Sequence, residues 1–296
     1  MQSLVEALER DLSLDAPDRL RERIEALDRL DALMPATGGG AQPRRAQALR
    51  LRLEAANAVQ FEAIRRSIRQ GDGGEALRRA WPAGDDNVRH AGDAYDWRDE
   101  LVSGVLSLGE PGDTAALAPE MVFYQPTPAR HVFDLLGRLE LGADDVLVDL
   151  GSGLGHVPLL AAICTRARGA GIEIEPAYVR SARACAQDLR LANAHFMQGD
   201  AREADFAIGS VFYLYTPFSG AILRSVLDAL RDEAGRRAFR VCSFGPCTAV
   251  LCAEPWLAGE DAPTPDRVAV FRTQGRATSP AAPARPSCSA MSSRRR

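Results

Sequence analysis

Residues 146–275 alternate between short apolar runs and stretches with helical periodicity, and no other feature of the sequence constrains the fold as strongly. The apolar runs are typical of buried strands, and they cover residues 146–150, 170–175, 194–198, 210–215, 239–244 and 268–272. Helices are expected between them, over residues 156–166, 176–192 and 219–231. Strands that alternate with helices form parallel sheets covered on both faces. The sequence therefore predicts an α/β fold with a doubly wound, mainly parallel sheet.

The first third of the chain lacks this alternation. Residues 1–70 repeat apolar positions at helical spacing, which predicts an N-terminal helical region. Residues 71–117 are rich in Gly and Asp and have weak periodicity, so we expect a linker or irregular cap with one short helix near 99–108. The sheet domain is expected over residues 118–275. Residues 276–296 consist mostly of Ser, Pro, Ala and Arg, which predicts a disordered tail.

Composition excludes several classes of function. All 36 basic residues are Arg, so covalent or phosphate-binding chemistry that needs a lysine is excluded. The net charge of −4 argues against binding to nucleic acid through bulk charge. No apolar run approaches the roughly 18 residues of a membrane span, and the acidic N-terminus is unlike a signal peptide. The six Cys show no close paired spacing, so we expect reduced cysteines, no metal site and a cytoplasmic location, with the oligomeric state open.

The strongest chemical signal is the sequence VLVDLGSGLG at residues 146–155. Gly151, Gly153 and Gly155 stand at alternate positions between a predicted strand and a predicted helix. Glycine lets the backbone turn sharply and leaves its amides open to a ligand. The helix that begins near His156 directs its amide dipoles to the same place. The turn, which includes Ser152, is therefore predicted to bind a ligand.

This turn departs from the dinucleotide-binding pattern. That pattern requires glycine at its first, third and sixth positions, and the sixth position from Gly151 is His156. A carboxylate, Asp149, stands two residues before the first glycine and would repel a pyrophosphate. A carboxylate at this position suits a ligand that carries an ammonium or sulfonium group.

Two further acids stand at the ends of predicted strands. Glu173 follows Gly151 by 22 residues, where a carboxylate can accept hydrogen bonds from both hydroxyls of a ribose. Glu175 is the adjacent alternative. Asp200, followed by Ala201, closes the third strand and can accept from an adenine amino group. Because the carboxyl ends of parallel strands meet at one edge of a sheet, these groups are expected to converge on one crevice.

Together these residues resemble the class I S-adenosylmethionine-dependent methyltransferases. The blocks DLGSGLGHV, GIEIEP and QGDA occur in the order and spacing of the family's cofactor motifs. The resemblance implies a Rossmann-like sheet and S-adenosyl-L-methionine as the cofactor. It implies that Asp149, Gly151 and Gly153 hold the methionine part, that Glu173 binds the ribose, and that Asp200 binds the adenine amino group.

The resemblance covers roughly residues 118–275. Ser152, Gly155 and Ala201 stand within the matching blocks and are assigned to the same cofactor site. The first 110 residues match no family that we can name.

Within that superfamily, DLGSGLG with a Glu that closes the ribose block is similar to the non-SET histone-lysine methyltransferases and to smaller protein-lysine methyltransferases. Those proteins carry an aromatic and Thr segment before the first strand, and FYQPTP at residues 123–128 resembles it. The resemblance implies that Tyr124 and Thr127 present hydroxyls to the carboxylate of the cofactor. The alternative is a plain proline turn that leads into a helix.

The sequence YLYTPF at residues 213–218 stands where the family has its substrate-side motif. Relatives that methylate amino groups of bases or glutamine have Asp or Asn and two prolines there, whereas this chain has Tyr or Thr and one Pro. Nucleobase methylation is therefore disfavoured. Tyr215 and Phe218 either wall a channel for an alkyl amine or belong to the strand core. Tyr215 and Tyr124 are the candidate catalytic residues, and His156 is a weaker candidate for a base.

Several functions stay open from the sequence. We expect an enzyme that methylates a side-chain amine of a protein. The alternatives are a small-molecule methyltransferase, a nucleic-acid methyltransferase, and a non-catalytic domain that binds S-adenosylmethionine. Residues 44–69 carry seven Arg and two Glu and offer a docking face for nucleic acid, but the acidic balance of the chain makes that partner the less expected one. No membrane partner is expected.

Overall fold

The computed structural model describes residues 2–33, 41–81, 92–109, 120–122 and 124–274. The helices are α1 (Gln2–Arg10), α2 (Leu20–Leu33), α3 (Ala41–Arg69), α4 (Gly73–Ala80), α5 (Trp97–Leu106), α6 (Ala129–Leu139), α7 (His156–Cys164), α8 (Pro176–Asp188), α9 (Gly220–Ala234) and α10 (Cys247–Cys252). The strands are β1 (Val146–Leu150), β2 (Arg168–Glu173), β3 (Ala194–Gln198), β4 (Val211–Tyr215), β5 (Arg240–Phe244), β6 (Leu257–Gly259) and β7 (Ala269–Thr273).

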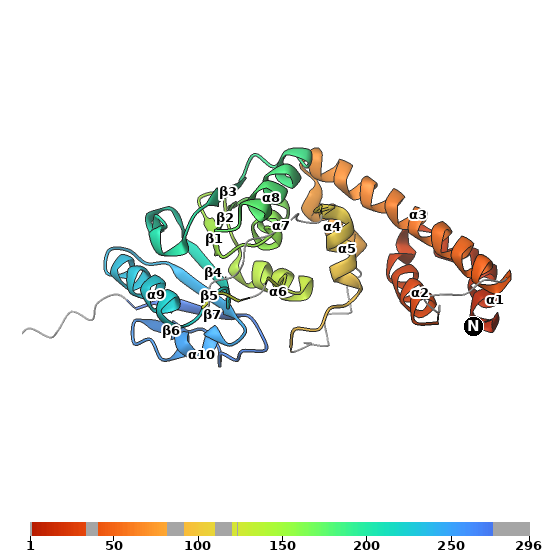
Figure 1. Cartoon of the computed structure of the whole chain (residues 1–296). Coiled ribbons are helices and arrows are strands. Elements are labelled where there is room, and N and C mark those ends of the chain that lie inside the picture. The colour runs from red at the N-terminus through yellow and green to blue at the C-terminus, as the bar shows by residue number, and fades with distance from the viewer. Residues whose placement is uncertain (1, 34–40, 82–91, 110–119, 123, 275–296) are drawn as a thin grey trace, which may run out of the picture.

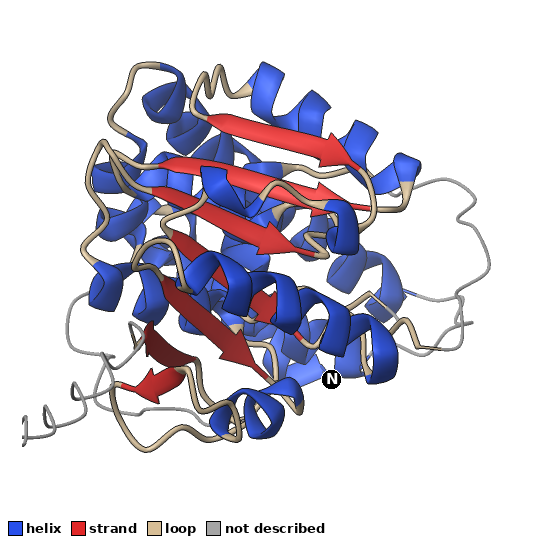
Figure 2. Cartoon of the chain, turned by 90° about the vertical axis from the view of Figure 1, so that its left-hand side faces the viewer, coloured by secondary structure: helices blue, strands red, loops and turns tan. Residues whose placement is uncertain are grey.

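Within the described residues the strands form one sheet, in the order β3-β2-β1-β4-β5-β7-β6 (Figure 2). The five strands from β3 to β5 in that order are parallel, whereas β7 is antiparallel to both β5 and β6. The order reverses between β1 and β4, and ligands of open α/β sheets bind at such a reversal, outside the carboxyl ends of the strands. The predicted α/β fold, a Rossmann-like, doubly wound and mainly parallel sheet with an N-terminal helical region, is confirmed.

Side chains of β1 alternate between the two faces of the sheet. Leu147 belongs to the apolar cluster that includes residues of α5, α6, α7 and α8. Val146 and Val148 belong to the cluster that includes residues of α9 and α10. All residues of β1 are buried, as expected for a central strand with helices on both faces. The continuous apolar run in the sequence thus reflects burial on both sides.

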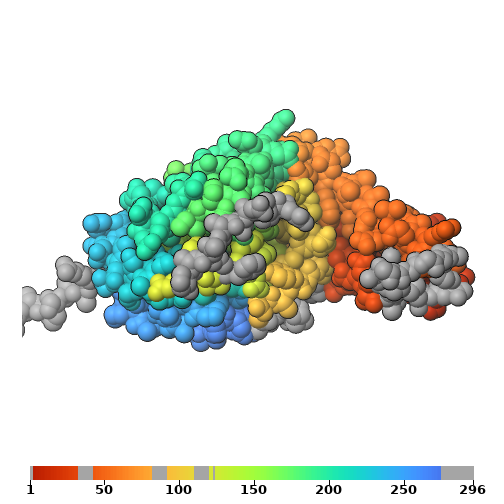
Figure 3. Space-filling model, viewed as in Figure 1, coloured from red at the N-terminus to blue at the C-terminus, as the bar shows by residue number. Residues whose placement is uncertain are grey.

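Helices α1, α2 and α3 form an arm that extends away from the sheet (Figures 1 and 3). Its outer part has a small apolar cluster of its own, which includes Leu8, Leu30 and Leu53. Farther along α3, Ile64 and Ile68 pack into the main core beside the sheet. The predicted helical region is therefore partly separate from the sheet and partly joined to it.

The segment over residues 71–117 contains more regular structure than expected. Besides the expected short helix, which is α5, it includes α4, whose glycine-rich start suggests a loop in the sequence. A Cβ at Gly74 would lie 3.2 Å from the Cα of Cys164 in α7, so glycine here allows close helix packing. The start of α5 is capped because Asp99 accepts a hydrogen bond from the Asp96 amide at 2.7 Å.

Two elements after β5, α10 and β6, were not expected from the sequence. β6 has three residues, too few for an alternating pattern to be visible. α10 has six residues and follows Pro246, which favours a helix start. β7 and β6 extend the sheet past its parallel part.

The division into residues 1–70, 71–117, 118–275 and 276–296 stays a prediction. The expected tail, 276–296, lies outside the described residues. Among the helices that the structure describes, none combines the length and apolar character needed to cross a bilayer.

Candidate functional site

A cavity of about 990 Å³ lies at the carboxyl ends of β1, β2, β3 and β4. The strand ends and the loops after them contribute Asp149, Gly151, Ser152, Ile172, Glu173, Glu175, Gly199, Asp200, Ala201, Arg202, Tyr213, Tyr215, Thr216 and Phe218. Segments that precede the sheet contribute Asp93, Met121, Val122, Tyr124, Gln125, Pro126 and Thr127. The fold therefore brings most of the predicted site residues to one place.

The glycine turn after β1 is bent sharply. Gly151, Gly153 and Gly155 have φ values of +79°, +53° and +84°, which glycine adopts without strain. Of the three, Gly151 alone borders the cavity. A Cβ at Gly153 would lie 1.9 Å from the ring of Tyr124, and a Cβ at Gly155 would lie 2.5 Å from the ring of Phe196. The second and third glycines therefore allow close packing around the turn.

Two backbone amides fix the carboxylate of Glu173 at the end of β2. Its Oε2 accepts from the Gly153 amide at 2.8 Å, and its Oε1 accepts from the Glu175 amide at 2.8 Å. Each oxygen can accept a further hydrogen bond from a ligand. The side chain of Glu175 instead caps α8, where it accepts from the Ala177 amide at 2.9 Å. Of the two acids considered from the sequence, Glu173 is the one held at the glycine turn.

Asp149 is a buried carboxylate at the end of β1, with 5% of its surface exposed. Within the described part of the chain, no hydrogen bond or ion pair reaches it. Burial, with a further contribution from the negative charge of Glu173, raises the pKa of Asp149 well above its ordinary value. A cation bound beside the two carboxylates would offset both the cost of burying the Asp149 charge and its repulsion from Glu173. The pair therefore fits a ligand with an ammonium or sulfonium group.

The hydroxyl of Ser152 is a second buried polar group that has no partner among the described residues. The residue borders the cavity, and its amide donates to the carbonyl of Ile172 at 3.1 Å. An unpaired buried hydroxyl typically costs about 1–3 kcal/mol. The hydroxyl packs against Gly171 of β2, where an added Cβ would lie 2.5 Å away, so the side of Ser152 that faces the cavity is not its hydroxyl.

Asp200 and Ala201 border the cavity after β3, and Asp200 already has a partner. Both carboxylate oxygens of Asp200 accept from the guanidinium of Arg202, at 2.6 to 3.1 Å. This hydrogen bonding lowers the pKa of Asp200. One oxygen also accepts from the Arg202 amide at 2.9 Å. An adenine amino group would therefore share Asp200 with Arg202 or displace it.

The segment before α6 approaches the turn from the other side. The hydroxyl of Tyr124 lies 3.0 Å from Nδ1 of His156, and its ring centroid lies 5.1 Å from that of Tyr178. The hydroxyl of Thr127 lies 2.8 Å from the hydroxyl of Tyr213. Both expected hydroxyls thus border the cavity and are already held by protein groups. The neighbouring residue of the predicted segment, 123, lies outside the described residues.

Tyr215 and His156 are uncharged at neutral pH. Burial, with Tyr95 and Asp93 adding to it, raises the pKa of Tyr215 to about 12. Burial lowers the pKa of His156 to about 4. Neither side chain is therefore poised to exchange a proton near pH 7.

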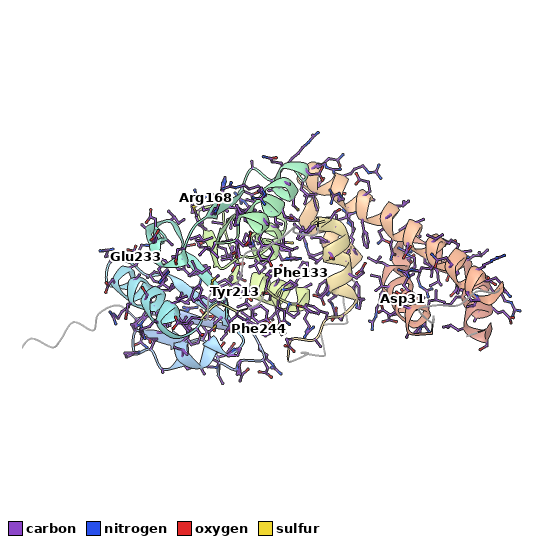
Figure 4. The ribbon with its side chains drawn as sticks, in the orientation of Figure 1. Asp31, Phe133, Arg168, Tyr213, Glu233 and Phe244 are labelled. Carbon is purple, nitrogen blue, oxygen red and sulfur yellow. The ribbon has the colours of Figure 1, made fainter. Side chains whose placement is uncertain are left out.

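Aromatic packing fixes this side of the cavity. The ring of Tyr215 lies 4.7 Å from that of Phe244, its register partner on β5. Tyr213 and Phe244 lie in the sheet region, far from Asp31 on the arm (Figure 4). Phe218 is buried and forms an isolated bridge with Met121.

The cavity lining includes polar residues that were not assigned to the site from the sequence, among them Asp93, Tyr178, Arg202 and Tyr213. Tyr178 and Arg202 follow the matching blocks by a few residues, so proximity in sequence is a usable signal for them. Tyr213 is within a strand, where its buried hydroxyl has no sequence signature. Asp93 comes from the segment expected as a linker. Among the described residues, no group of three or more His, Cys, Asp or Glu side chains is arranged to bind a metal ion.

The middle of the chain matches a known family. A family model described as a methyltransferase domain matches residues 141–234. A search of curated proteins finds no match.

Among solved structures, the chain is similar to an RNA methyltransferase from Salinibacter ruber in complex with S-adenosyl-L-homocysteine. The two are 31% identical over 50% of this chain and 92% of that chain, with a TM-score of 0.41. The chain is also similar to a geranyl diphosphate C-methyltransferase from Streptomyces coelicolor, at 17% identity over 40% of this chain and 45% of that chain, with a TM-score of 0.34. A tRNA methyltransferase from Bacillus subtilis is 15% identical over 49% of this chain and 66% of that chain, with a TM-score of 0.39.

Proposed function

Because the chain belongs to the class I S-adenosylmethionine-dependent methyltransferases, we propose that it transfers a methyl group to an amine on a protein side chain. Its general activity is methyl transfer, and its cofactor is S-adenosyl-L-methionine. The acceptor class and the role of each residue are our inference. The observation that carries the acceptor class is the excess of carboxylates around the cavity.

When bound, the cofactor supplies a methyl group on a positively charged sulfur. In this proposal Asp149, whose carboxylate has no partner among the described residues, and the bare backbone of Gly151 bind its methionine part. The amides of Ser152 and Gly153 hold the turn itself, since they already donate to Ile172 and Glu173. Glu173, whose oxygens are already aligned by two amides, binds the ribose hydroxyls. Asp200 and Ala201 bind the adenine.

Four more predicted residues support this site in the same proposal. Ser152 borders the cavity and lines the cofactor, while its hydroxyl is buried against Gly171. Thr127 contacts the cofactor carboxylate while Tyr213 orients its hydroxyl. Gly153 and Gly155 keep the turn closed against Tyr124 and a buried phenylalanine, so their contribution is to the shape of the turn.

The charge of the cavity favours a cationic acceptor. Among the described residues that border it, five are carboxylic acids and one is an arginine. The acids are Asp93, Asp149, Glu173, Glu175 and Asp200, and the arginine, Arg202, is paired with Asp200. A cavity with this balance attracts an ammonium group and repels a phosphate. Four of these acids are assigned to the cofactor or cap α8, so in this proposal Asp93 is the acid that favours an amine acceptor over a phosphate-bearing one.

Tyr215 and Tyr124 are proposed to position the acceptor. Methyl transfer requires alignment of the nucleophile with the methyl group and exclusion of water. The ring of Tyr215 offers a face to an alkyl ammonium, and its raised pKa keeps the hydroxyl protonated. Tyr124 closes over Gly153 and excludes water there. A proton of the acceptor ammonium leaves to solvent before transfer in this scheme.

Ion pairs within the chain weaken the case for the nucleic-acid alternative. Seven arginines stand in residues 44–69, and five of them form ion pairs with carboxylates in the structure. The five are Arg45, Arg50, Arg52, Arg65 and Arg69, with partners on α1, α2, α3, α8 and the turn after α1. Paired arginines bind phosphates less well because a carboxylate already compensates their charge.

One observation favours a small-molecule acceptor as the second candidate. A cavity of about 990 Å³ is at the upper end of the usual range for small-ligand sites. Such a volume can enclose a cofactor together with a small acceptor.

Tritiated-methyl labelling separates these acceptors. The full chain is incubated with labelled S-adenosylmethionine and a cell lysate, either intact or deproteinised, and the products are treated with protease or nuclease. We expect protease-sensitive label that appears as methyl-lysine on hydrolysis. Since this chain contains no Lys, such label must come from another protein.

The Asp149→Ala variant is the control and should incorporate no label. Label confined to the deproteinised fraction would support the small-molecule acceptor. Nuclease-sensitive label would overturn the protein acceptor in favour of RNA or DNA.

A further inference from the structure

The residues that follow the undescribed stretch 82–91 form a short strap across one side of the cavity. We call residues 92–96 the strap. They precede α5 and therefore lie outside residues 141–234, the part that matches the methyltransferase family. Within the strap, Asp93 borders the cavity.

Hydrogen bonds from three directions hold the strap in place. The Gly92 amide donates to the carbonyl of Asp266 at 2.8 Å. The Gly92 carbonyl accepts from the Arg130 guanidinium and lies 2.8 Å from Nε2 of His131, both on α6. The hydroxyl of Tyr95 donates to the carbonyl of Pro126 at 2.9 Å, and Arg130 also donates to the Ala94 carbonyl. The backbone on both sides of Asp93 is therefore tied to fixed elements.

The charge of Asp93 acts on the acceptor side of the cavity. Its carboxylate is one of the groups that raise the pKa of Tyr215, after burial and Tyr95. Tyr215 ends β4, whereas Glu173 ends β2, on the opposite side of β1 in the sheet. Asp93 thus acts on the opposite side of β1 from Glu173, while Asp149 lies at the end of β1 itself, next to β4.

Asp93 itself is free to interact with a ligand. It is exposed, and within the described residues its carboxylate takes part in no hydrogen bond or ion pair. A carboxylate beside an aromatic ring is a favourable place for an alkyl ammonium, because charge attraction and cation–π contact act together. A neutral group of the same shape would gain neither.

We propose that Asp93 selects a cationic acceptor at the mouth of the cavity. This inference rests on the proposed function, and it assigns acceptor specificity to a segment outside the shared methyltransferase domain. Asp93 acts on capture of the ammonium group and takes no part in the transfer step. Its loss should therefore raise KM for an amine acceptor with little change in kcat.

Binding of small probes tests the proposal without a known acceptor. The full chain is saturated with S-adenosylhomocysteine and titrated with n-butylammonium, or with n-butanol as a neutral probe of the same length. Dissociation constants are measured by ligand-observed NMR. We expect n-butylammonium to bind about fivefold or more tighter than n-butanol. The difference should narrow as NaCl rises from about 50 to about 500 mM, since Asp93 is exposed to salt.

Two variants with the same change of charge make the test specific. Asp93→Asn should remove the preference for n-butylammonium and leave n-butanol and S-adenosylhomocysteine binding unchanged. Asp144→Asn is the matched control, because Asp144 is exposed before β1, at the opposite edge of the sheet. It should keep the preference intact.

The outcomes separate this inference from the proposed function. Equal binding of the two probes to the unmodified chain, or a preference that survives Asp93→Asn, overturns the role of Asp93 even if S-adenosylhomocysteine binds. Failure to bind S-adenosylhomocysteine counts against the assigned cofactor site instead. The titrations are repeated without S-adenosylhomocysteine. Asp149 and Glu173 then also attract the cation, so the contribution of Asp93 is read as the difference in n-butylammonium affinity between the unmodified chain and Asp93→Asn, and the absence of a difference overturns its role.

Discussion

The carboxylate of Glu173 accepts a hydrogen bond from the amide of Gly153 at 2.8 Å, which joins the end of β2 to the turn after β1. The contact needs a glycine turn that points its amide at the neighbouring strand and an acid at the end of that strand. Each motif therefore supports the position of the other. The predictions below start from this contact and from the groups around it.

Replacing Glu173 should weaken cofactor binding. In Glu173→Ala, the ribose would lose its acceptors and the Gly153 amide would lose its partner, so we expect at least about a tenfold loss of S-adenosylmethionine affinity. Calorimetry measures this directly. Glu203→Gln is the control, because Glu203 is exposed and does not border the cavity. Unchanged affinity in both Glu173→Ala and Asp149→Ala would contradict the cofactor assignment.

Asp149→Asn should raise the stability of the fold while it lowers the affinity for the cofactor. The pKa of Asp149 is raised in the folded chain, so its carboxyl favours folding at pH values where it is protonated and opposes folding once the pH rises through the folded pKa. At pH 8 the variant should gain about 1 kcal/mol of stability, or about 2–4 °C in Tm, while its affinity for S-adenosylmethionine falls.

The gain in stability should disappear near pH 4, where Asp149 is neutral in the unfolded chain as well. Thermal melts at the two pH values check the sign. A variant less stable than the parent at pH 8 would show that the Asp149 carboxylate has a stabilising partner.

His156 should make the fold sensitive to acid. Burial lowers its pKa from 6.5 to about 4, so the neutral ring favours folding above pH 6.5 and that contribution is lost as the pH falls toward 4. The loss amounts to at most about 3 kcal/mol. Urea unfolding at several pH values should show a shallower decline for His156→Gln, whereas His195→Gln, at an exposed position, should decline like the parent.

Gly153 should tolerate no side chain. Its φ is +53°, and an added Cβ would lie 1.9 Å from the ring of Tyr124. We expect Gly153→Ala to lower the free energy of unfolding by about 1–3 kcal/mol. Gly199→Ala is the matched control, since no atom lies within 4 Å of a Cβ there. In the double variant Gly153→Ala with Tyr124→Ala, the clash with the ring is absent, so the alanine at 153 should cost less free energy of unfolding than it does beside Tyr124. Equal destabilisation by Gly153→Ala and Gly199→Ala would refute the role of Gly153 in the turn.

Local sequence patterns predicted several residues that border the cavity. Glycines between a strand and a helix, and acids at strand ends, have the same meaning in any doubly wound sheet, so Asp149, Gly151 and Glu173 could be named before the fold was seen. The exact contacts of these residues could not be predicted. Whether Gly155 faces the cavity or Phe196 depends on how α8 packs against β3, which no local pattern encodes.

Residues brought in from a distance were the hardest to predict. Asp93 stands in a stretch with weak periodicity, and its place at the cavity depends on hydrogen bonds to α6 and to the loop before β7. The pairing of Asp200 with Arg202 was also missed, although the residues are two apart, because an exposed Asp and Arg form an ion pair only when their rotamers agree. Likewise α4 was not predicted, because its glycines suggest a loop in the sequence, whereas in the fold they allow close packing of helices.

One continuous helix, α3, links the arm to the sheet. α3 contributes Leu53 to the outer cluster and Ile64 to the main core, and no break in its backbone separates the two. Its 29 residues span about 44 Å. A continuous helix bends little over that length, so whatever binds the far end of α3 is kept at a set distance and bearing from the cavity. The outer cluster is thus held at a fixed distance from the core beside the sheet.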